Sequence, residues 1–188
     1  MLDSESRWRL VRRLRTRPMP VVGEEVIRPA ANSDLPKIRE IYNFFVKNTV
    51  VTFDEEPMSL QEWEEKFEHL QKLGLPFLVL QGEHGEVIGF AYLAPWRQKS
   101  GYRKTAENSI YLQPAATGHR RGTELLAALI EAGRQSGVRE IVAVIADRGA
   151  EASIRLHERQ GFIIQGKLGK VGYKFGKPIG TILMQRSL

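Results

Sequence analysis

Helical patterns mark four segments of the chain. In the first three, apolar residues recur three and four positions apart, as on one face of an α-helix, and the fourth ends before Gly161. Start signals precede two of these segments: Ser33 or Asp34 comes just before Pro36, and Ser59 with Glu62 forms a capping-box pattern. We therefore predict helices over residues 35–45, 60–73, 121–136 and 151–160.

Shorter apolar or alternating runs predict seven strands. These runs cover residues 25–28, 76–81, 87–94, 105–112, 140–145, 162–168 and 181–185. Residues 140–145 are almost wholly apolar, which is typical of a strand buried on both faces. We predict polar loops at residues 95–104 and in the Gly- and Lys-rich stretch 169–180.

The order of these elements indicates a mixed α/β fold. An antiparallel meander is followed by a β-α-β crossover, then by a final helix and hairpin. No repeat or linker interrupts residues 25–188, so we predict one domain there, preceded by an N-terminal extension over residues 1–24.

Composition narrows the chemistry. The 188 residues include no Cys, which excludes disulfides and cysteine-based metal or nucleophile chemistry. We expect no metal. The longest apolar runs have six residues, far below the roughly 20 of a membrane span. The basic N-terminus lacks the apolar stretch of a signal peptide, so we expect a cytoplasmic protein without a membrane partner.

The positive charge is concentrated at the N-terminus. Residues 1–17 hold six of the arginines against two acidic residues, which is +4 of the net +6. This arm could form a basic amphipathic helix that ends before Pro18 and Pro20. It is either a non-functional extension, a packing segment or a contact for nucleic acid or anionic lipid. Because the body is nearly neutral, we expect no nucleic-acid partner.

The strand at 105–112 and the loop after it carry the candidate chemistry. Glu107 shares one strand face with Ser109 and Tyr111, because side chains alternate along a strand. It is either a solvated residue or a base. Gly118 and Gly122 precede a helix N-terminus, a place that binds phosphate. His119, Arg120 and Arg121 add donors and positive charge there.

Several motifs carry a family resemblance. They are Ile41-Tyr42-Asn43, Thr52-Phe53, Ala94-Pro95-Trp96-Arg97, Tyr102-Arg103 with Thr105 and Glu107, Ser109-Ile110-Tyr111, Ala152–Glu158 with Gly161-Phe162, Val171–Gly176 and Met184-Gln185. In this order, and over about residues 25–188, the chain resembles the GNAT N-acetyltransferases. Within them it is most similar to the phosphinothricin and methionine sulfone (sulfoximine) acetyltransferases.

The resemblance implies transfer of an acetyl group from acetyl-CoA to the primary amine of a small, amino-acid-like acceptor. It implies a mostly antiparallel seven-stranded sheet, splayed between the strands at 105–112 and 140–145, with helices on both faces. Glu107 would be the general base, and His157 would protonate the leaving thiolate or share the base role. The cofactor would bind at Ile110, Tyr111, Leu112, Thr117, Gly118, His119, Arg120, Arg121, Gly122, Thr123 and Ser153.

On the acceptor side, the resemblance implies an aromatic-walled pocket with cationic ends. Its residues would be Phe53, Trp96, Arg97, Tyr102, Arg103, Thr105, Tyr173 and Lys174. Arg binds carboxylate or phosphinate oxygens in a two-pronged fashion, which favours an amino-acid-like acceptor. The family also implies a homodimer.

The loop at 117–122 departs from the family pattern. Thr117 stands where Arg or Gln is usual, and Arg120 stands where glycine is common. Two alternatives therefore stay open: a non-catalytic acyl-CoA-binding domain, or an acetyltransferase that modifies a macromolecular amine.

Overall fold

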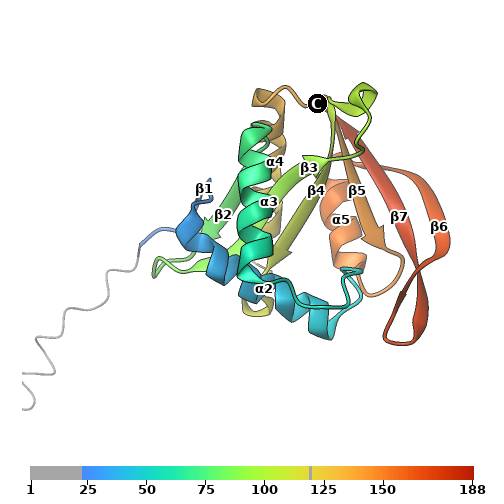
Figure 1. Cartoon of the computed structure of the whole chain (residues 1–188), viewed down its shortest axis with the longest axis horizontal. Helices are drawn as coiled ribbons and strands as arrows, with labels where there is room; N and C mark the ends of the chain where they lie inside the picture. The colour runs from blue at the N-terminus through green and yellow to red at the C-terminus, as the bar shows by residue number, and fades with distance from the viewer. Residues whose placement is uncertain (1–22, 119) are drawn as a thin grey trace, which may run out of the picture.

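The computed structural model describes residues 23–118 and 120–188. Its seven-stranded sheet has the order β1-β2-β3-β4-β5-β7-β6 (Figure 1). All neighbouring strands are antiparallel except β4 and β5. This confirms the predicted mixed, mostly antiparallel sheet. The strands are β1 (Val26–Pro29), β2 (Phe77–Gln81), β3 (Val87–Pro95), β4 (Thr105–Leu112), β5 (Glu140–Ala146), β6 (Ile163–Lys174) and β7 (Lys177–Ser187).

Helices cover both faces of the sheet. They are α2 (Leu35–Asn48), α3 (Leu60–Lys72), α4 (Arg121–Gln135) and α5 (Glu151–Arg159), with 3₁₀ turns at Asn32–Asp34, Ser100–Tyr102 and Pro114–Ala116. Neighbouring residues of β3 show the two layers: Phe90 packs into the core under α2 and α3, whereas Ala91 packs into the core under α4. The sheet is thus a middle layer with a hydrophobic core on each side.

Local signals account for the helix ends. Ser59 and Glu62 form the predicted capping box at the start of α3, and Gly74 follows its end with φ +66°. Asp34 is the N-cap of α2, but its carboxylate does not cap that helix. It accepts hydrogen bonds from the Ala31 amide and from the Arg28 guanidinium instead.

The sheet opens between β4 and β5. These two parallel strands pair over only three positions, ending at Glu107 and Val142. Beyond this point β4 stays paired with β3 and β5 stays paired with β7. The facing edges of β4 and β5 therefore diverge, as the family resemblance implies.

Two predictions about strands were wrong. Residues 169–180 are not a loop, because β6 and β7 run through them and pair as far as Lys174 and Lys177. Gly and Lys have low strand propensity, but the neighbouring strand overrides it. The strand at 140–146 is not buried on both faces either. Val144 is 36% exposed, because β4 no longer pairs with β5 at this position.

The predicted arm over residues 1–17 lies outside the described residues, so its role stays a prediction. At the edge of the described part, the Gly23 amide donates to the Glu83 carbonyl in the β2–β3 turn, at 2.7 Å. None of the described helices is long and apolar enough to cross a membrane.

Candidate active site

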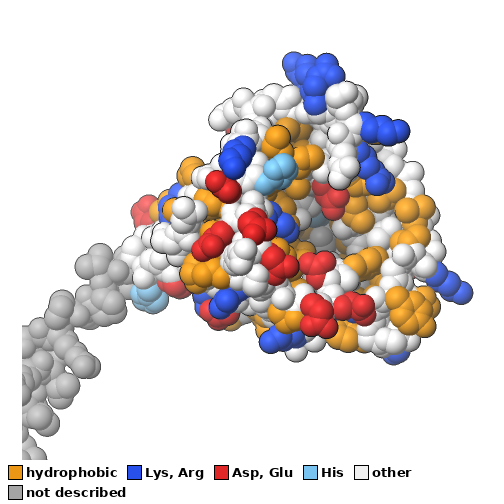
Figure 2. Space-filling model, viewed as in Figure 1, with side chains coloured by type: hydrophobic (Ala, Val, Ile, Leu, Met, Phe, Trp, Pro, Cys, Tyr) orange, Lys and Arg blue, Asp and Glu red, His pale blue; other side chains and the backbone are white. Residues whose placement is uncertain are grey.

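A cavity of about 820 Å³ occupies the opening between β4 and β5. Figure 2 shows this face of the molecule hollowed between α3 and α5. All of β4 from Glu107 to Leu112 lines the cavity, as do parts of β5, α5 and the loop before α4. The cavity thus extends from the last β4–β5 pair to the N-terminus of α4.

Glu107 lies at the end of this cavity where β4 and β5 stop pairing. It is half-buried, and burial raises the pKa of its carboxyl above the usual value, while the positive charge of Arg97 partly offsets this. Glu107 and Asn108 lie on opposite faces of the sheet, as the sequence predicts. Tyr111, on the Glu107 face, packs toward α2, whereas Ile110 and Leu112, on the Asn108 face, pack toward α4. A half-buried carboxylate in a cleft has the properties of a general base.

His157 lines the cavity from α5, and both of its ring nitrogens are already engaged. Nδ1 lies 2.8 Å from the Ser153 carbonyl oxygen, and Nε2 lies 2.9 Å from Nδ2 of Asn108. The ring is 2% exposed and stands edge-on to Phe162. Burial lowers the pKa of His157, so the ring is neutral at neutral pH.

The glycine-bearing loop closes the other end of the cavity. Gly118 has φ +91° and Arg120 has φ +62°, a left-handed conformation that is costly for a residue with a Cβ. Thr117, Gly118, Arg120, Gly122 and Thr123 line the cavity at the start of α4. Unpaired N–H groups and the positive end of the helix dipole make such a terminus suitable for phosphate.

Arg121 does not line this cavity. Its guanidinium pairs with the Glu25 carboxylate and donates to the Ala116 carbonyl. This ion pair ties the start of α4 to the segment before β1. Of the other predicted cofactor residues, Ile110, Tyr111, Leu112 and Ser153 line the cavity, and His119 lies outside the described residues.

On the side of α2 and α3, a polar network borders the cavity. The Tyr42 hydroxyl donates to the Asp54 carboxylate at 2.6 Å and lies 2.8 Å from the Thr52 hydroxyl. Lys66 reaches the same cavity from α3 and Tyr92 from β3. The cavity that Glu107 lines therefore also presents both acidic and basic groups.

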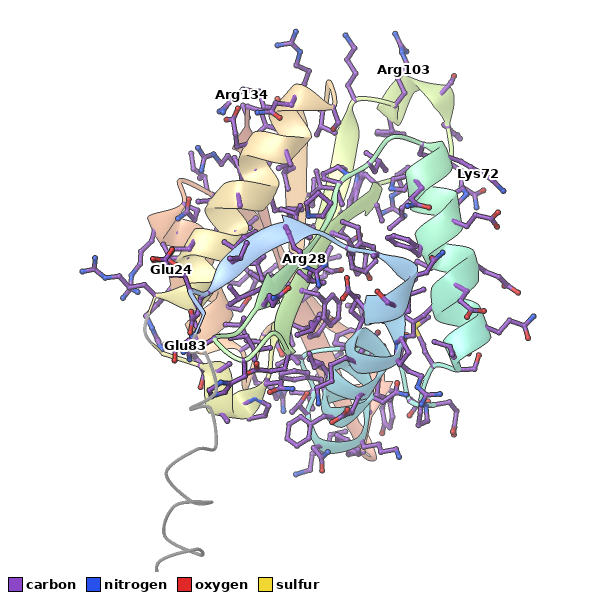
Figure 3. All side chains as sticks on the ribbon, turned by 90° about the vertical axis from the view of Figure 1, so that its left-hand side faces the viewer. Glu24, Arg28, Lys72, Glu83, Arg103 and Arg134 are labelled. Carbon is purple, nitrogen blue, oxygen red and sulfur yellow. The ribbon has the colours of Figure 1, made fainter. Side chains whose placement is uncertain are left out.

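The predicted acceptor residues fall into two groups. Phe53 lines the cavity, but the others do not. Trp96 and Arg97 stack on each other at 4.7 Å, and Arg103 projects from the 3₁₀ turn at Ser100–Tyr102 (Figure 3). Tyr102 is also exposed on this turn, and Thr105 begins β4 opposite Glu140.

The β6–β7 hairpin reaches the loop that holds Phe53. Lys174 is 2% exposed and donates to the Thr52 carbonyl at 2.8 Å. Gly172 lies so close to the Phe53 ring that a Cβ at this position would stand 2.3 Å from a ring carbon. Lys174 thus anchors the hairpin beneath the cavity wall, whereas its neighbour Tyr173 is 65% exposed.

Sequence reasoning missed several residues of the cavity, although two carried a signal. Asn108 is polar on a strand face that otherwise packs into a core. Lys66 lies three positions after Trp63, so it shares the inward face of its helix. The other cavity residues with polar side chains that the predicted site leaves out are Tyr42, Thr52, Asp54, Tyr92, Ser109, Arg159 and Thr181.

Comparison with known proteins identifies the family. The Acetyltransferase (GNAT) domain model matches residues 27–183. The chain belongs to this family. A curated L-methionine sulfoximine/L-methionine sulfone acetyltransferase of Pseudomonas aeruginosa is 41% identical over 162 residues, which cover 86% of this chain and 94% of the relative.

Solved GNAT structures have the same fold. An acetyltransferase from Salmonella typhimurium, solved with its cofactor acetyl-CoA, is 37% identical with a TM-score of 0.84, covering 88% of this chain and 95% of the other. A phosphinothricin acetyltransferase from Sinorhizobium meliloti, in complex with AcCoA, is 38% identical with a TM-score of 0.84, covering 87% and 88%. The chain is therefore an N-acetyltransferase with the GNAT fold, as the motifs predict.

Proposed function

We propose that this GNAT domain transfers the acetyl group of acetyl-CoA to the primary amine of a small amino-acid-like acceptor, with Glu107 as the general base. The observation that carries the proposal is the cavity itself, which has a phosphate-suited helix terminus at one end and a half-buried carboxylate at the other. Relatives named for methionine sulfone, methionine sulfoximine and phosphinothricin support this class of acceptor.

The cavity residues fit an extended donor that carries phosphates at one end and a thioester at the other. Thr117, Gly118, Arg120, Gly122 and Thr123 would hold the pyrophosphate. The edge of β4 beyond Glu107 has no partner on β5, so the backbone at Ile110–Leu112 is available to the amides of the pantetheine arm. Bound acetyl-CoA supplies the activated acetyl group.

Glu107 supplies the proton transfer in this proposal. The acceptor arrives as an ammonium ion and must lose a proton, directly or through a water, before its nitrogen can attack. A new C–N bond then forms as the C–S bond breaks. The nitrogen loses its second proton as the amide forms, and the CoA thiolate takes up one proton and leaves as the thiol. The raised pKa of Glu107 suits a base that works near neutral pH.

We assign His157 a positioning role. The Ser153 carbonyl can only accept a hydrogen bond, so Nδ1 carries the proton of the neutral ring. Nε2 must then accept from Asn108. In this arrangement the ring has neither a free lone pair for an ammonium proton nor a free N–H for a thiolate. This proposal differs from the catalytic role expected from the sequence: His157 would hold β4 and α5 together and would not itself transfer a proton.

The test uses the purified protein with acetyl-CoA and a panel of methionine sulfone, methionine sulfoximine, phosphinothricin and free amino acids. We expect CoA release and an N-acetylated product, identified by mass, with at least one acceptor. Acetyl-CoA at 100 times its Kd should stabilise the fold by about 2.7 kcal/mol. Stabilisation without product would favour a non-catalytic acyl-CoA-binding domain, and the absence of both would refute the proposal. A homodimer and a cytoplasmic location stay predictions.

A further inference from the structure

Lys66 is a cation held over aromatic rings at the wall of the cavity. Its Nζ atom lies 4.8 Å from the centre of the Trp63 ring and 5.5 Å from that of Tyr92. Trp63 is fully buried and Tyr92 nearly so, and therefore the two rings that contact the ammonium are held in place by the core. The aromatic faces attract the ammonium and fix its position, and Lys66 itself lines the cavity.

No carboxylate of the described residues lies within ion-pair distance of this ammonium. Glu62, one turn earlier on α3, is exposed, and its pKa is lowered mainly by hydrogen bonds with Ser59 and to a smaller extent by the charge of Lys66. Within residues 23–118 and 120–188, no ion pair joins Lys66 to an acidic side chain, and its only hydrogen-bond acceptor is the Met58 sulfur at 3.8 Å. Thioether sulfur is a weak acceptor. By contrast, Lys72 on the same helix pairs with Glu68 at 3.2 Å. Lys66 therefore has unused capacity to bind an anion from inside the cavity.

The same cavity holds negative charge where an amine would bind. Glu107 and Asp54 both line it, and Asp54 is held by the Tyr42 hydroxyl. An α-amino acid carries an ammonium and a carboxylate on one carbon atom. A cavity that holds carboxylates and a separate, unpaired cation therefore complements a zwitterionic amino acid better than it complements a simple amine.

We propose that Lys66 is a specificity-determining residue that binds the carboxylate of the acceptor. This inference rests on the proposed function, and it adds a residue that lies outside the sequence motifs. It also explains how an amino-acid acceptor is recognised although Arg97, Arg103 and Tyr173 do not line the cavity.

The test compares two acceptors that differ only in the carboxylate: methionine sulfone and 3-(methylsulfonyl)propylamine. In Lys66→Met, which keeps the apolar stem over Trp63, we expect kcat/KM for methionine sulfone to fall about 10- to 100-fold, the scale of one lost charge-assisted contact. The amine without a carboxylate should change less than about twofold, and the KM for acetyl-CoA should not change. Lys66→Arg should restore much of the loss.

Lys72→Met is the matched control, because Lys72 lies on the outer side of the same helix (Figure 3). An equal loss with both acceptors would show that Lys66 only supports packing, and no loss with either would also overturn the inference. Calorimetric binding of methionine sulfone to the CoA-loaded protein separates this inference from the proposed function. Binding that is weakened in Lys66→Met supports the role of Lys66 even if turnover is absent, and wild-type protein that binds no carboxylate-bearing amine refutes it.

Discussion

Nε2 of His157 accepts a hydrogen bond from Nδ2 of Asn108 at 2.9 Å, while its Nδ1–H is donated to the Ser153 carbonyl. This pair joins α5 to β4 just beyond the last β4–β5 backbone pair, where the sheet itself no longer connects the two sides. It also fixes the Asn108 amide, whose Oδ1 is buried and has no hydrogen-bond partner in the described part of the chain.

We expect Asn108→Ala and His157→Phe to act as one unit. Each should lower kcat/KM about tenfold and destabilise the fold by about 1–2 kcal/mol, and the double variant should cost little more than either single change. The pH profile is the decisive measurement. If His157 only positions its neighbours, the acid limb of kcat/KM survives in His157→Phe at its wild-type pH. Loss of that limb would return the base role to His157.

Glu107→Gln should abolish the acid limb. Only the deprotonated carboxylate can accept a proton, so activity rises with pH through the pKa of Glu107, which burial raises above its ordinary 4.5. Removing the base should lower kcat by about 10²- to 10⁴-fold while thermal stabilisation by acetyl-CoA stays. A wild-type rate in Glu107→Gln would contradict the assignment.

Arg97 supplies a control for this pH dependence. Its positive charge lowers the pKa of Glu107 against the larger effect of burial. Arg97→Met should therefore move the acid limb to higher pH, whereas Arg103→Met, an exposed change on the same loop, should leave it in place. Equal shifts in both variants would indicate a nonspecific effect of net charge.

Arg120→Gly should slightly raise the stability of the fold while it weakens the binding of acetyl-CoA. The left-handed backbone at φ +62° costs an L-residue about 1–2 kcal/mol, which glycine avoids. The greater freedom of glycine in the unfolded chain offsets part of this gain, so we expect a rise in Tm of a few degrees at most. Loss of the charge at the phosphate end should raise the KM for acetyl-CoA several-fold, and less so at high salt. An unchanged KM would mean that Arg120 does not face the phosphates.

The Arg28–Asp34 ion pair should make stability depend on pH. Asp34 is buried and receives two hydrogen bonds from Arg28, at 2.7 and 2.9 Å, which lower the pKa of its carboxyl below the ordinary 3.8. Because the pKa of Asp34 is lower in the folded than in the unfolded chain, the ion pair stabilises the fold at pH values above the unfolded pKa. This stabilisation is lost as the pH falls through the folded pKa. Asp34→Asn should cost about 2 kcal/mol at pH 7 and progressively less toward pH 3. Denaturant unfolding at both pH values measures this, and a pH-independent cost would contradict it.

The amino-acid sequence by itself determined the features that depend on neighbours along the chain. Helical spacing, the Ser59 capping box and the alternation of Glu107 with Asn108 follow from local geometry, and the structure has them where the pattern predicts. The order of the strands and the family motifs extended this to the mixed sheet and to its opening beside Glu107.

Only the tertiary structure decided which polar groups are still free to act. Arg121 pairs with Glu25, which is 96 positions distant in the sequence, and does not line the cavity. Nε2 of His157 is occupied by Asn108, which is 49 positions distant, whereas the Ser153 carbonyl at Nδ1 is a local partner on α5. Among the described residues, packing also leaves Lys66 without an ion pair, and it extends the last hairpin through a Gly- and Lys-rich stretch. The availability of a charged or polar side chain depends on partners far away in the chain, and no local pattern records them.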